Sequence, residues 1–190
     1  MNLVLASTSI YRKELLSRLK IPFNALKPLA DEDALKGQWT NPLERAQNLA
    51  RCKAESLKKA SSVVIGSDQL AQLEGRILEK PHGFDKALEQ LTFMAGKTHE
   101  LITAVHICQN EDTFYSFTDI TRLTMKPLTE DQIKSYLLKE EPYDCAGSYK
   151  IEKLGITLFD KIETQDFTAI TGLPLIELSK QLTKMGFNIP

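Results

Sequence analysis

Residues 62–69 read Ser-Val-Val-Ile-Gly-Ser-Asp-Gln. The first five are small or β-branched and uncharged, which predicts a fully buried strand over Ser62–Gly66 in the interior of a mixed sheet. An acidic residue, Asp68, follows directly from this strand. Ligand groups collect at strand ends in α/β sheets, so Asp68 is a candidate to hold a divalent cation or to accept a proton from water. The alternative is a turn aspartate that hydrogen-bonds its own backbone.

An amphipathic helix is predicted directly before this strand. The residues 41–44, Asn-Pro-Leu-Glu, form a strong helix start, with Asn as N-cap, proline in the first turn and Glu at N3. One helical face carries the apolar residues, and Lys53 lies within that face. Lys53 therefore either buries its stem while the ammonium reaches out, or points inward toward a ligand.

The N-terminal residues predict a second anion-binding feature. A short buried strand over Asn2–Ala6 runs into a helix through small hydroxyl residues, and either Ser7 or Ser9 can cap that helix. Free N–H groups at a helix start attract phosphate, and Arg12 would add charge-assisted hydrogen bonds to the same anion. Neither GxxxxGK[ST] nor GxGxxG occurs in the chain. The local alternative is an ordinary cap with a solvated arginine.

Two further segments carry charged candidates. Asp31, Glu32 and Asp33 cluster the hard oxygen atoms that Mg²⁺ and Mn²⁺ prefer, or they form a solvated acidic loop. Lys80 follows a predicted hairpin around residues 74–75 and either binds phosphate or lies on the surface.

Residues 145–152, CAGSYKIE, form a third segment of interest. Their small side chains let a backbone approach a ligand closely. Cys145 has no histidine or acid in a triad order, so it is predicted to be buried and inert.

The remaining pattern alternates strands and helices, which predicts a mixed α/β chain. The expected segments are a strand over Ile21–Leu29, a helix over Phe84–Met94, two long strands over Thr98–Gln109 and Thr113–Met125, a helix from a capping box at 129–132 to Glu140, a strand over Ile156–Phe159 and a helix from Pro174 to Gly186. The two long central strands favour antiparallel pairing over a purely parallel doubly wound sheet.

Composition limits the function classes. The chain has 190 residues, 24 Lys and Arg against 25 Asp and Glu, and 42% hydrophobic residues, which suits one globular domain or two small lobes around one core. Neutrality argues against a nucleic acid polymer or an anionic membrane as partner. The three scattered cysteines and three histidines form neither CxxC nor HExxH, so we expect no disulfide scaffold or structural zinc. The N-terminus does not resemble a signal peptide and the apolar runs are short, so a cytoplasmic protein is expected.

Taken together, these segments resemble the Maf family of nucleotide pyrophosphatases. The matching segments occur in family order over nearly the whole chain, which makes the set specific. They are LASTSIYRKELL (5–16), ADE (30–32), ARCKAESL (50–57), VIGSDQ (64–69), EKP (79–81), CAGSYKIE (145–152), GITLF (155–159) and GLPL (172–175).

The resemblance implies one Maf-like domain over residues 1–190, with a mixed, partly antiparallel central sheet flanked by helices and two lobes around a nucleotide cleft, as in ITPase-like proteins. It implies hydrolysis of a nucleoside triphosphate between the α and β phosphates, a divalent cation (Mg²⁺ or Mn²⁺), and a possible homodimer. By the same resemblance Asp68 is the proton acceptor, and Glu32 and Asp68 bind the metal. The residues that hold the phosphates are Ser7, Arg12, Lys53 and Lys80.

Within the family, the chain looks most like the branch that hydrolyses 7-methyl-GTP. That branch has Gln after the catalytic Asp and Glu at the position of Glu152, whereas the dTTP/UTP branch has Thr and Gln. Tyr11, Gln69 and Glu152 match the positions tied to base choice, although the branch usually has Trp where this chain has Tyr11. N7 methylation makes guanine a cation, which stacks favourably on an aromatic ring, by about 0.5–2 kcal/mol, and suits a carboxylate partner.

Other functions stay open at this point. The chain could be a dTTP/UTP-type pyrophosphatase, or a nucleotide-binding regulator of septum formation without catalysis. An acid at the phosphates would repel the ligand of a pure binder, so Asp68 favours an enzyme. The family suggests a housecleaning role against modified nucleotides.

Overall fold

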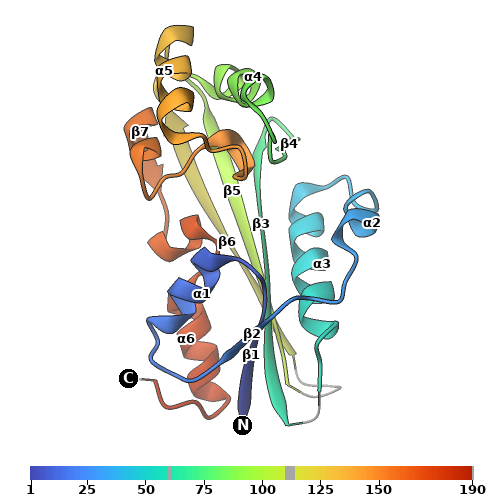
Figure 1. Ribbon diagram of the computed structural model, residues 1–190. Helices are drawn as coiled ribbons and strands as arrows, with labels where there is room; N and C mark the ends of the chain where they lie inside the picture. Colours follow the sequence, from blue (N-terminus) through green and yellow to red (C-terminus); the bar gives the residue numbers. More distant parts are fainter. Residues whose placement is uncertain (60, 110–113, 190) are drawn as a thin grey trace. The chain divides into compact units, whose positions relative to one another are not determined.

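The computed structural model describes residues 1–59, 61–109 and 114–189. The chain alternates strands, α-helices and three short 3₁₀ helices (Figure 1). In chain order these are β1 (Asn2–Ala6), α1 (Ile10–Ser17), β2 (Asn24–Leu26), α2 (Glu32–Lys36), α3 (Pro42–Glu55), β3 (Ser62–Leu73), β4 (Arg76–Leu78), α4 (Phe84–Met94), β5 (Thr98–Cys108), β6 (Phe114–Met125), α5 (Glu130–Glu140), η1 (Ala146–Ser148), η2 (Leu154–Leu158), β7 (Phe159–Glu163), η3 (Phe167–Thr171) and α6 (Leu175–Lys184).

The strands form one mixed sheet of seven, with the order β2-β1-β3-β5-β6-β7 and β4 paired to β3. β1 pairs in parallel with both β2 and β3, whereas β3–β4 and β6–β7 are antiparallel. The predicted mixed sheet with flanking helices is therefore confirmed. The two long strands β5 and β6 are neighbours, as expected.

The chain divides into two compact units. Unit 1 comprises Met1–Gln69, Thr103–Asp119 and Asp166–Pro190, and unit 2 comprises Leu70–Ile102 and Ile120–Gln165. β3, β5 and β6 each contribute residues to both units. The predicted single Maf-like domain and its nucleotide cleft stay predictions.

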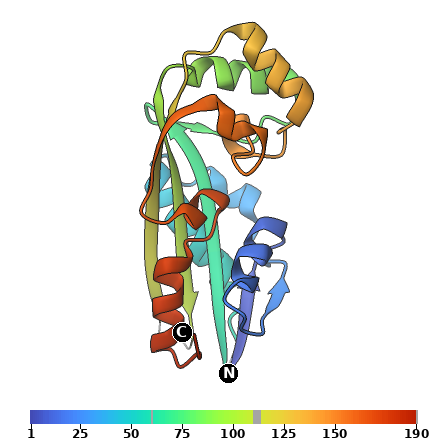
Figure 2. The ribbon, with the colours of Figure 1, turned by 90° about the vertical axis from the view of Figure 1, so that its left-hand side faces the viewer.

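Residue parity decides which helix covers which face of the sheet in unit 1. Successive side chains of a strand point to opposite faces. The odd-numbered residues of β1 and β3 (Leu3, Leu5, Val63 and Ile65) pack with leucines of α1 and α6 in one buried cluster. The even-numbered Val4, Ala6 and Val64 pack with Ala54 of α3 in another. Figures 1 and 2 show α3 on one face of the strands and α1 and α6 on the other.

The predicted end of the central strand was wrong. β3 does not stop at Gly66 but continues to Leu73, so Asp68 lies inside a strand. The strand continues because its polar residues find partners and because Ala71–Leu73 pair with β4. β1 does end opposite Gly66, so Ser67 and Asp68 lie beyond the carboxyl end of β1. The expectation of ligand groups at a strand end therefore applies to β1 and not to β3.

Two other strand predictions were wrong in extent. The segment Ile21–Leu29 contains only the three-residue β2, because the prolines at positions 22 and 28 lack the N–H that a longer ladder needs. The segment Ile156–Phe159 is mostly the 3₁₀ helix η2, and β7 begins at Phe159. Gly155 allows this tight turn, since a Cβ there would lie 2.4 Å from the carbonyl oxygen of Lys150.

The predicted helix starts and turns were confirmed. Asn41 caps α3 by accepting from the N–H of Glu44, and Thr129 and Gln132 form the capping box of α5. The turn between β3 and β4 has positive φ at both Glu74 and Gly75, as a two-residue type I′ hairpin requires. None of the helices within the described residues is long and apolar enough to cross a membrane.

Unit 2 is built around the pair of helices α4 and α5. Their buried residues include Ala87, Leu91 and Met94 of α4 and Ile133 and Leu137 of α5. η1 packs on α4 and η2 packs on α5. The strands β3–β4 and β6–β7 contribute antiparallel pairs to this unit.

Candidate active site

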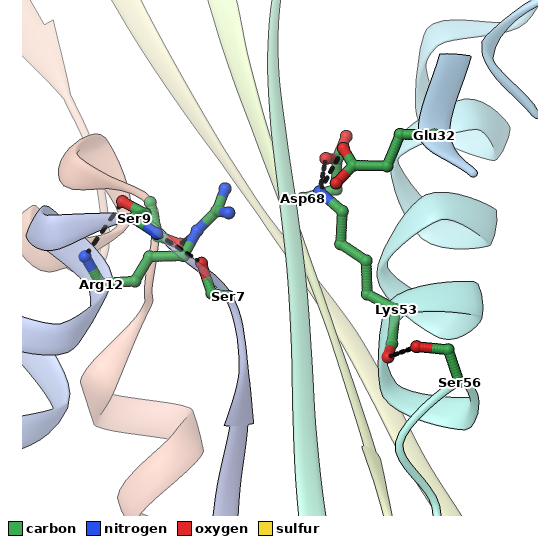
Figure 3. A network of polar contacts seen from close by, with 8 residues as sticks. Ser7, Ser9, Arg12, Glu32, Lys53, Ser56 and Asp68 are labelled. Atoms are coloured by element: carbon green, nitrogen blue, oxygen red, sulfur yellow. Dashed lines mark hydrogen bonds and ion pairs between the residues drawn. The ribbon is translucent and has the colours of Figure 1, made fainter. Parts of the chain in front are cut away.

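Lys53 is the centre of a polar cluster in unit 1. Its Nζ atom lies 2.7 Å from Oδ1 of Asp68 and 2.9 Å from Oε2 of Glu32 (Figure 3). Lys53 is only 5% exposed although it lies in the last turn of a helix. Of the two alternatives that the sequence left open for Lys53, the structure selects the inward-pointing one. A buried ammonium requires partners of opposite charge, and the two carboxylates supply them.

The contact between Lys53 and Asp68 depends on how closely α3 approaches β3. Gly66, two residues before Asp68, lies on the same face of the strand as that carboxylate. A Cβ at Gly66 would lie 2.1 Å from the carbonyl oxygen of Ala50 and 2.6 Å from the amide nitrogen of Ala54. The helix therefore packs directly on the glycine backbone. That approach places Lys53, one residue before Ala54, within hydrogen-bond distance of Asp68.

Of the clustered acids at 31–33, Glu32 is the one that joins Lys53. Asp31 serves instead as the N-cap of α2 and accepts a hydrogen bond of 3.2 Å from the N–H of Ala34. Glu32 is thereby held at the first position of a short capped helix, with its side chain 38% exposed. The acidic segment is thus partly a helix cap and partly a component of the site.

The carboxylates of Glu32 and Asp68 converge on one cation, which is the arrangement that a divalent metal ion needs. Mg²⁺ is commonly bound by one or two carboxylates, with the remaining ligands from water and substrate phosphates. Within the described residues there is no group of three or more His, Cys, Asp or Glu side chains suited to a metal. The two carboxylates therefore fit a metal site whose other ligands are water and substrate phosphates. The described residues contain no group of side chains that would form a metal site from protein ligands alone.

Arg12 lies on the opposite face of β3 from Lys53 (Figure 3). Its Nε donates a hydrogen bond of 3.0 Å to the carbonyl oxygen of Gly172. The hydroxyl of Ser67 donates to the same carbonyl oxygen at 2.9 Å. Ser67 is an odd-numbered residue of β3, so it faces α1 and α6, whereas Asp68 faces α3. One strand thus separates an arginine-bearing face from a lysine-bearing face.

The two faces are electrostatically coupled. Burial lowers the pKa of the Arg12 guanidinium from its ordinary value, and the carboxylates of Asp68 and Glu32 act in the opposite direction. Those carboxylates therefore lie close enough to stabilise the arginine charge. The pairing of β1 with β3 ends at Gly66, so no residue of β1 is paired with Asp68.

The hydroxyl residues at the start of α1 divide their roles. Ser9 is the N-cap and accepts from the N–H of Arg12 at 3.3 Å, while Ser7 accepts from the N–H of Ser9 at 3.1 Å. Ser7 is buried, at 5% exposed, and Tyr11 is half-buried on the first turn of the helix. Ser7, Tyr11 and Arg12 therefore belong to one short segment, and a role in substrate binding for each stays a prediction.

Gln69 uses its side-chain amide within unit 1. Its Nε2 atom contacts Oγ1 of Thr103 at 2.8 Å and the carbonyl oxygens of Ala169 and Ile170 at 2.8 and 3.1 Å. The predicted tie of Gln69 to base choice is untested.

The remaining predicted residues belong to unit 2. Lys80 follows β4 and is exposed, and Glu152 is exposed in the turn after η1. The segment that carries Glu152 is anchored by buried polar contacts: Ser148 donates to Gln90 at 2.6 Å, and the hydroxyl of Tyr149 lies 2.8 Å from Nε2 of His99. Roles for Lys80 and Glu152 stay predictions.

Cys145 belongs to the same segment. Burial, with the nearby carboxylate of Asp144, raises the pKa of its thiol to about 12. The thiol is therefore protonated near neutral pH, which agrees with the predicted inert cysteine, although Cys145 is partly exposed and not buried as predicted.

Sequence reasoning missed Ser67, Gly172 and Thr103. Gly172 lies in the GLPL segment, and the sequence assigns it no role. Its φ of 100° and the 3.3 Å between a Cβ at this position and Nε of Arg12 are invisible in the sequence. Once β3 is known to continue beyond Gly66, the alternation along the strand assigns Ser67 to the face opposite Asp68.

Comparisons with known proteins identify the family of the chain. Residues 2–185 match the family described as Maf-like protein. The chain is 57% identical over 180 residues to the 7-methyl-GTP pyrophosphatase of Bdellovibrio bacteriovorus, covering 95% of both chains. It is 41% identical over 188 residues to the 7-methyl-GTP pyrophosphatase of Xanthomonas campestris, covering 99% of this chain and 98% of that relative.

Solved structures show the same fold at low sequence identity. A HAM1 protein from Coxiella burnetii aligns with a TM-score of 0.54 at 11% identity, covering 97% of this chain and 99% of that chain. The Ham1 protein of Staphylococcus aureus aligns with a TM-score of 0.50 at 12% identity, covering 95% and 98%. The family match over residues 2–185, together with relatives of this identity and coverage, shows that the chain belongs to the Maf family.

Proposed function

We propose that this protein hydrolyses a nucleoside triphosphate between the α and β phosphates, releasing the monophosphate and pyrophosphate, and that 7-methyl-GTP is its substrate. The observation that carries the proposal is the buried Lys53 ammonium shared by Asp68 and Glu32, with Arg12 in electrostatic reach. The names of relatives at 57% and 41% identity support the same reaction. The physiological role that we propose is the removal of modified nucleotides.

In the proposed reaction, Asp68 and the two cations Lys53 and Arg12 have separate roles. Asp68 accepts a proton from a water molecule as the oxygen of that water attacks the α-phosphorus. The bond between the α-phosphorus and the bridging oxygen breaks, and the electron pair leaves with pyrophosphate. Lys53 and Arg12 offset the negative charge that grows on the phosphate oxygens and on the leaving group. Ser7 and Lys80 add further phosphate contacts in this proposal.

Lys53 has a second effect on Asp68. It contacts Oδ1 at 2.7 Å and thereby fixes the orientation of the carboxylate. We assign the proton from water to Oδ2. A carboxylate that a buried ammonium holds at one oxygen keeps a fixed orientation toward the attacking water. This fixed orientation lowers the entropic part of the barrier.

The proposed metal cofactor, Mg²⁺ or Mn²⁺, would be held by Glu32 and Asp68. When bound, it would supply positive charge to the phosphate oxygens and help to orient them. Both residues are hard oxygen donors already directed at one cation. In the structure, Lys53 is the counter-charge of both carboxylates.

Base selection is assigned to Tyr11, Gln69 and Glu152. The ring of Tyr11 offers a face on which a cationic 7-methylguanine stacks, by about 0.5–2 kcal/mol. Glu152 would accept from N1 and N2 of the base and offset its positive charge. A glutamine at this position would lose the charge term, so Glu152 favours a cationic purine over thymine or uracil.

A substrate panel tests the proposal. The purified protein, with Mg²⁺ or Mn²⁺, is offered 7-methyl-GTP, GTP, dTTP, UTP and CTP, and pyrophosphate release is measured. We expect the highest kcat/KM for 7-methyl-GTP. A preference for dTTP or UTP would move the protein to the other branch. Tight nucleotide binding without pyrophosphate release would make it a nucleotide-binding regulator.

A further inference from the structure

The amide nitrogen of Gln69 is committed to the protein itself. Its Nε2 has two protons and three acceptors within 3.1 Å: Oγ1 of Thr103 and the carbonyl oxygens of Ala169 and Ile170. An amide nitrogen with this many partners has no proton left to donate to a nucleotide base. A role for this nitrogen must therefore pass through the atoms that it holds.

Those atoms belong to the turn that carries Gly172. The N–H of Gly172 donates to the carbonyl oxygen of Ala169 at 2.9 Å, and this bond closes the turn at the end of η3. The same Ala169 carbonyl accepts from Gln69 at 2.8 Å and from the hydroxyl of Thr103 at 3.0 Å. Gln69 and Thr103 thus fix the acceptor on which the position of Gly172 depends.

Gly172 in turn orients Arg12. Its carbonyl oxygen accepts from Nε of Arg12 at 3.0 Å and from the hydroxyl of Ser67 at 2.9 Å. A guanidinium held through Nε directs its two terminal nitrogens in a defined direction, and those nitrogens bind phosphate in a bidentate manner. The direction of the Arg12 fork is therefore set by a main-chain carbonyl that substitution cannot remove.

The other end of the same segment is also fixed. Oδ1 of the buried Asp166 accepts from the N–H and the hydroxyl of Thr168, at 2.9 and 2.5 Å, and Oδ2 accepts from the N–H of Ile176 at 2.7 Å. Asp166 thereby joins the start of η3 to the start of α6. Gln69 and Thr103 hold the remaining part, between Ala169 and Gly172.

The strand alternation explains why Gln69 has this role. Ser67 and Gln69 are two residues apart on β3, so both side chains lie on the face covered by α1 and α6. Asp68 lies between them in sequence and points to the opposite face, toward Lys53. Neighbouring residues of one strand therefore have different roles. Asp68, the proposed proton acceptor, lies on one face, and Ser67 and Gln69 lie on the face of Arg12.

We propose that Gln69, together with Thr103, is a positioning residue that orients the phosphate-binding Arg12 through the 169–172 turn. The proposal rests on the proposed function, because it assigns Arg12 to the phosphates. It also explains how a residue at position 69 can influence a nucleotide that its amide nitrogen does not contact. This effect of the amide nitrogen is exerted at the phosphates, beside the proposed role of Gln69 in base choice.

A double-mutant cycle tests the proposal with activity. Gln69→Leu removes the three donor contacts, and Gln47→Leu is the matched control, because Gln47 makes a surface contact of 3.3 Å with the hydroxyl of Thr118 in the same unit. We expect Gln69→Leu to lower kcat/KM for 7-methyl-GTP about tenfold. In an Arg12→Ala background the same change is expected to lower it less than about twofold. Equal losses in both backgrounds would overturn the proposal.

Thr103→Val is the second variant, and it serves if Gln69→Leu does not fold. It removes the hydroxyl that donates to Ala169 and accepts from Gln69. We expect its kcat/KM to fall about threefold, with the loss again absent in the Arg12→Ala background. Gln47→Leu is expected to keep the wild-type values of kcat and KM.

A measurement without substrate separates this proposal from the proposed function. The ¹⁵N–¹H signal of the Arg12 Nε–H, assigned as the signal lost in Arg12→Lys, reports the hydrogen bond to Gly172. We expect its exchange with water to be at least about fivefold faster in Gln69→Leu and Thr103→Val than in the wild type and Gln47→Leu. Unchanged exchange would refute the positioning role even if the enzyme is active. Faster exchange in a protein that releases no pyrophosphate would refute the proposed function alone.

Discussion

Nζ of Lys53 lies 2.7 Å from Oδ1 of Asp68, and the two residues reach each other from a helix and a strand that are adjacent in the chain. The contact is buried, with 6% of the lysine side chain and 12% of the aspartate side chain exposed. Since Glu32 also binds the ammonium, two negative charges share one positive charge. This cluster therefore carries a net charge of about −1 and favours a further cation at the same place.

Asp68→Asn tests the proposed base. The amide still accepts a hydrogen bond from Lys53 but cannot take a proton from water, so turnover of 7-methyl-GTP is expected to fall by about 10²-fold or more. Pyrophosphate release and the melting temperature are measured together. Asp160→Asn, at an exposed position in unit 2, is the control and is expected to keep wild-type turnover. Near wild-type activity in folded Asp68→Asn would show that another group accepts the proton.

Lys53→Met tests whether Glu32 and Asp68, which both contact the Lys53 ammonium, are also metal ligands. Without the lysine, Glu32 and Asp68 lose the cation that contacts both of them, so the nucleotide-free variant is expected to bind Mn²⁺ about tenfold more tightly than the wild type. Binding is measured by electron paramagnetic resonance of free Mn²⁺, without any assay of activity. Mn²⁺ affinity equal to or below the wild-type value would contradict the assignment of Glu32 and Asp68 as metal ligands.

Glu152→Gln tests whether Glu152 senses the positive charge of the 7-methylguanine ring. We expect kcat/KM for 7-methyl-GTP to fall about tenfold and kcat/KM for GTP to change less than about threefold, because the neutral base gains nothing from a carboxylate charge. The two substrates differ only by the methyl group and its charge, so each serves as the control for the other. Equal losses would mean that Glu152 does not sense that charge.

Gly66→Ala tests the close approach of α3 to β3. A Cβ there would lie 2.1 Å from the carbonyl oxygen of Ala50, so the helix must shift and the free energy of unfolding is expected to fall by about 3 kcal/mol. Gly37→Ala is the matched control, since a Cβ at Gly37 would have nothing within 4 Å and its φ is −74°. Urea unfolding measures both. A stable Gly66→Ala protein with an intact Lys53–Asp68 pair would contradict this packing.

The pH dependence of stability is tested at His99. Burial lowers the pKa of this histidine to about 4, and within the described residues its Nδ1 has no hydrogen-bond partner. The unfolded chain takes up a proton near pH 6.5 and the folded chain does not, so this residue lowers stability as the pH falls from about 6.5 to 4. The loss amounts to about 3 kcal/mol at most.

His99→Gln is expected to remove most of that pH-dependent loss in urea unfolding between pH 7 and 4. His82→Gln, at an exposed position, is the control and is expected to keep the wild-type slope with pH. The same slope in His99→Gln and the wild type would assign the acid sensitivity to other groups.

Local sequence rules predicted α1, α3, α4, α5 and α6 but not the short α2, since the signals of the longer helices lie in adjacent residues. The caps at Asn41 and Thr129 and the hairpin at Glu74 and Gly75 follow from hydrogen bonds and φ angles within four residues. The end of β3 was not predictable in this way. A polar pair such as Ser67 and Asp68 looks like the end of a buried strand until its distant partners are known.

The sequence by itself determined the family and the presence of Lys53 on the apolar face of its helix. Only the tertiary structure decided that Lys53 turns inward between Asp68 and Glu32, and that Gly172, 160 residues from Arg12, holds its guanidinium. Local hydrogen bonds and periodicity act over a few residues. The pairing of buried charges depends instead on which elements pack together, and here on a glycine that lets α3 contact the backbone of β3.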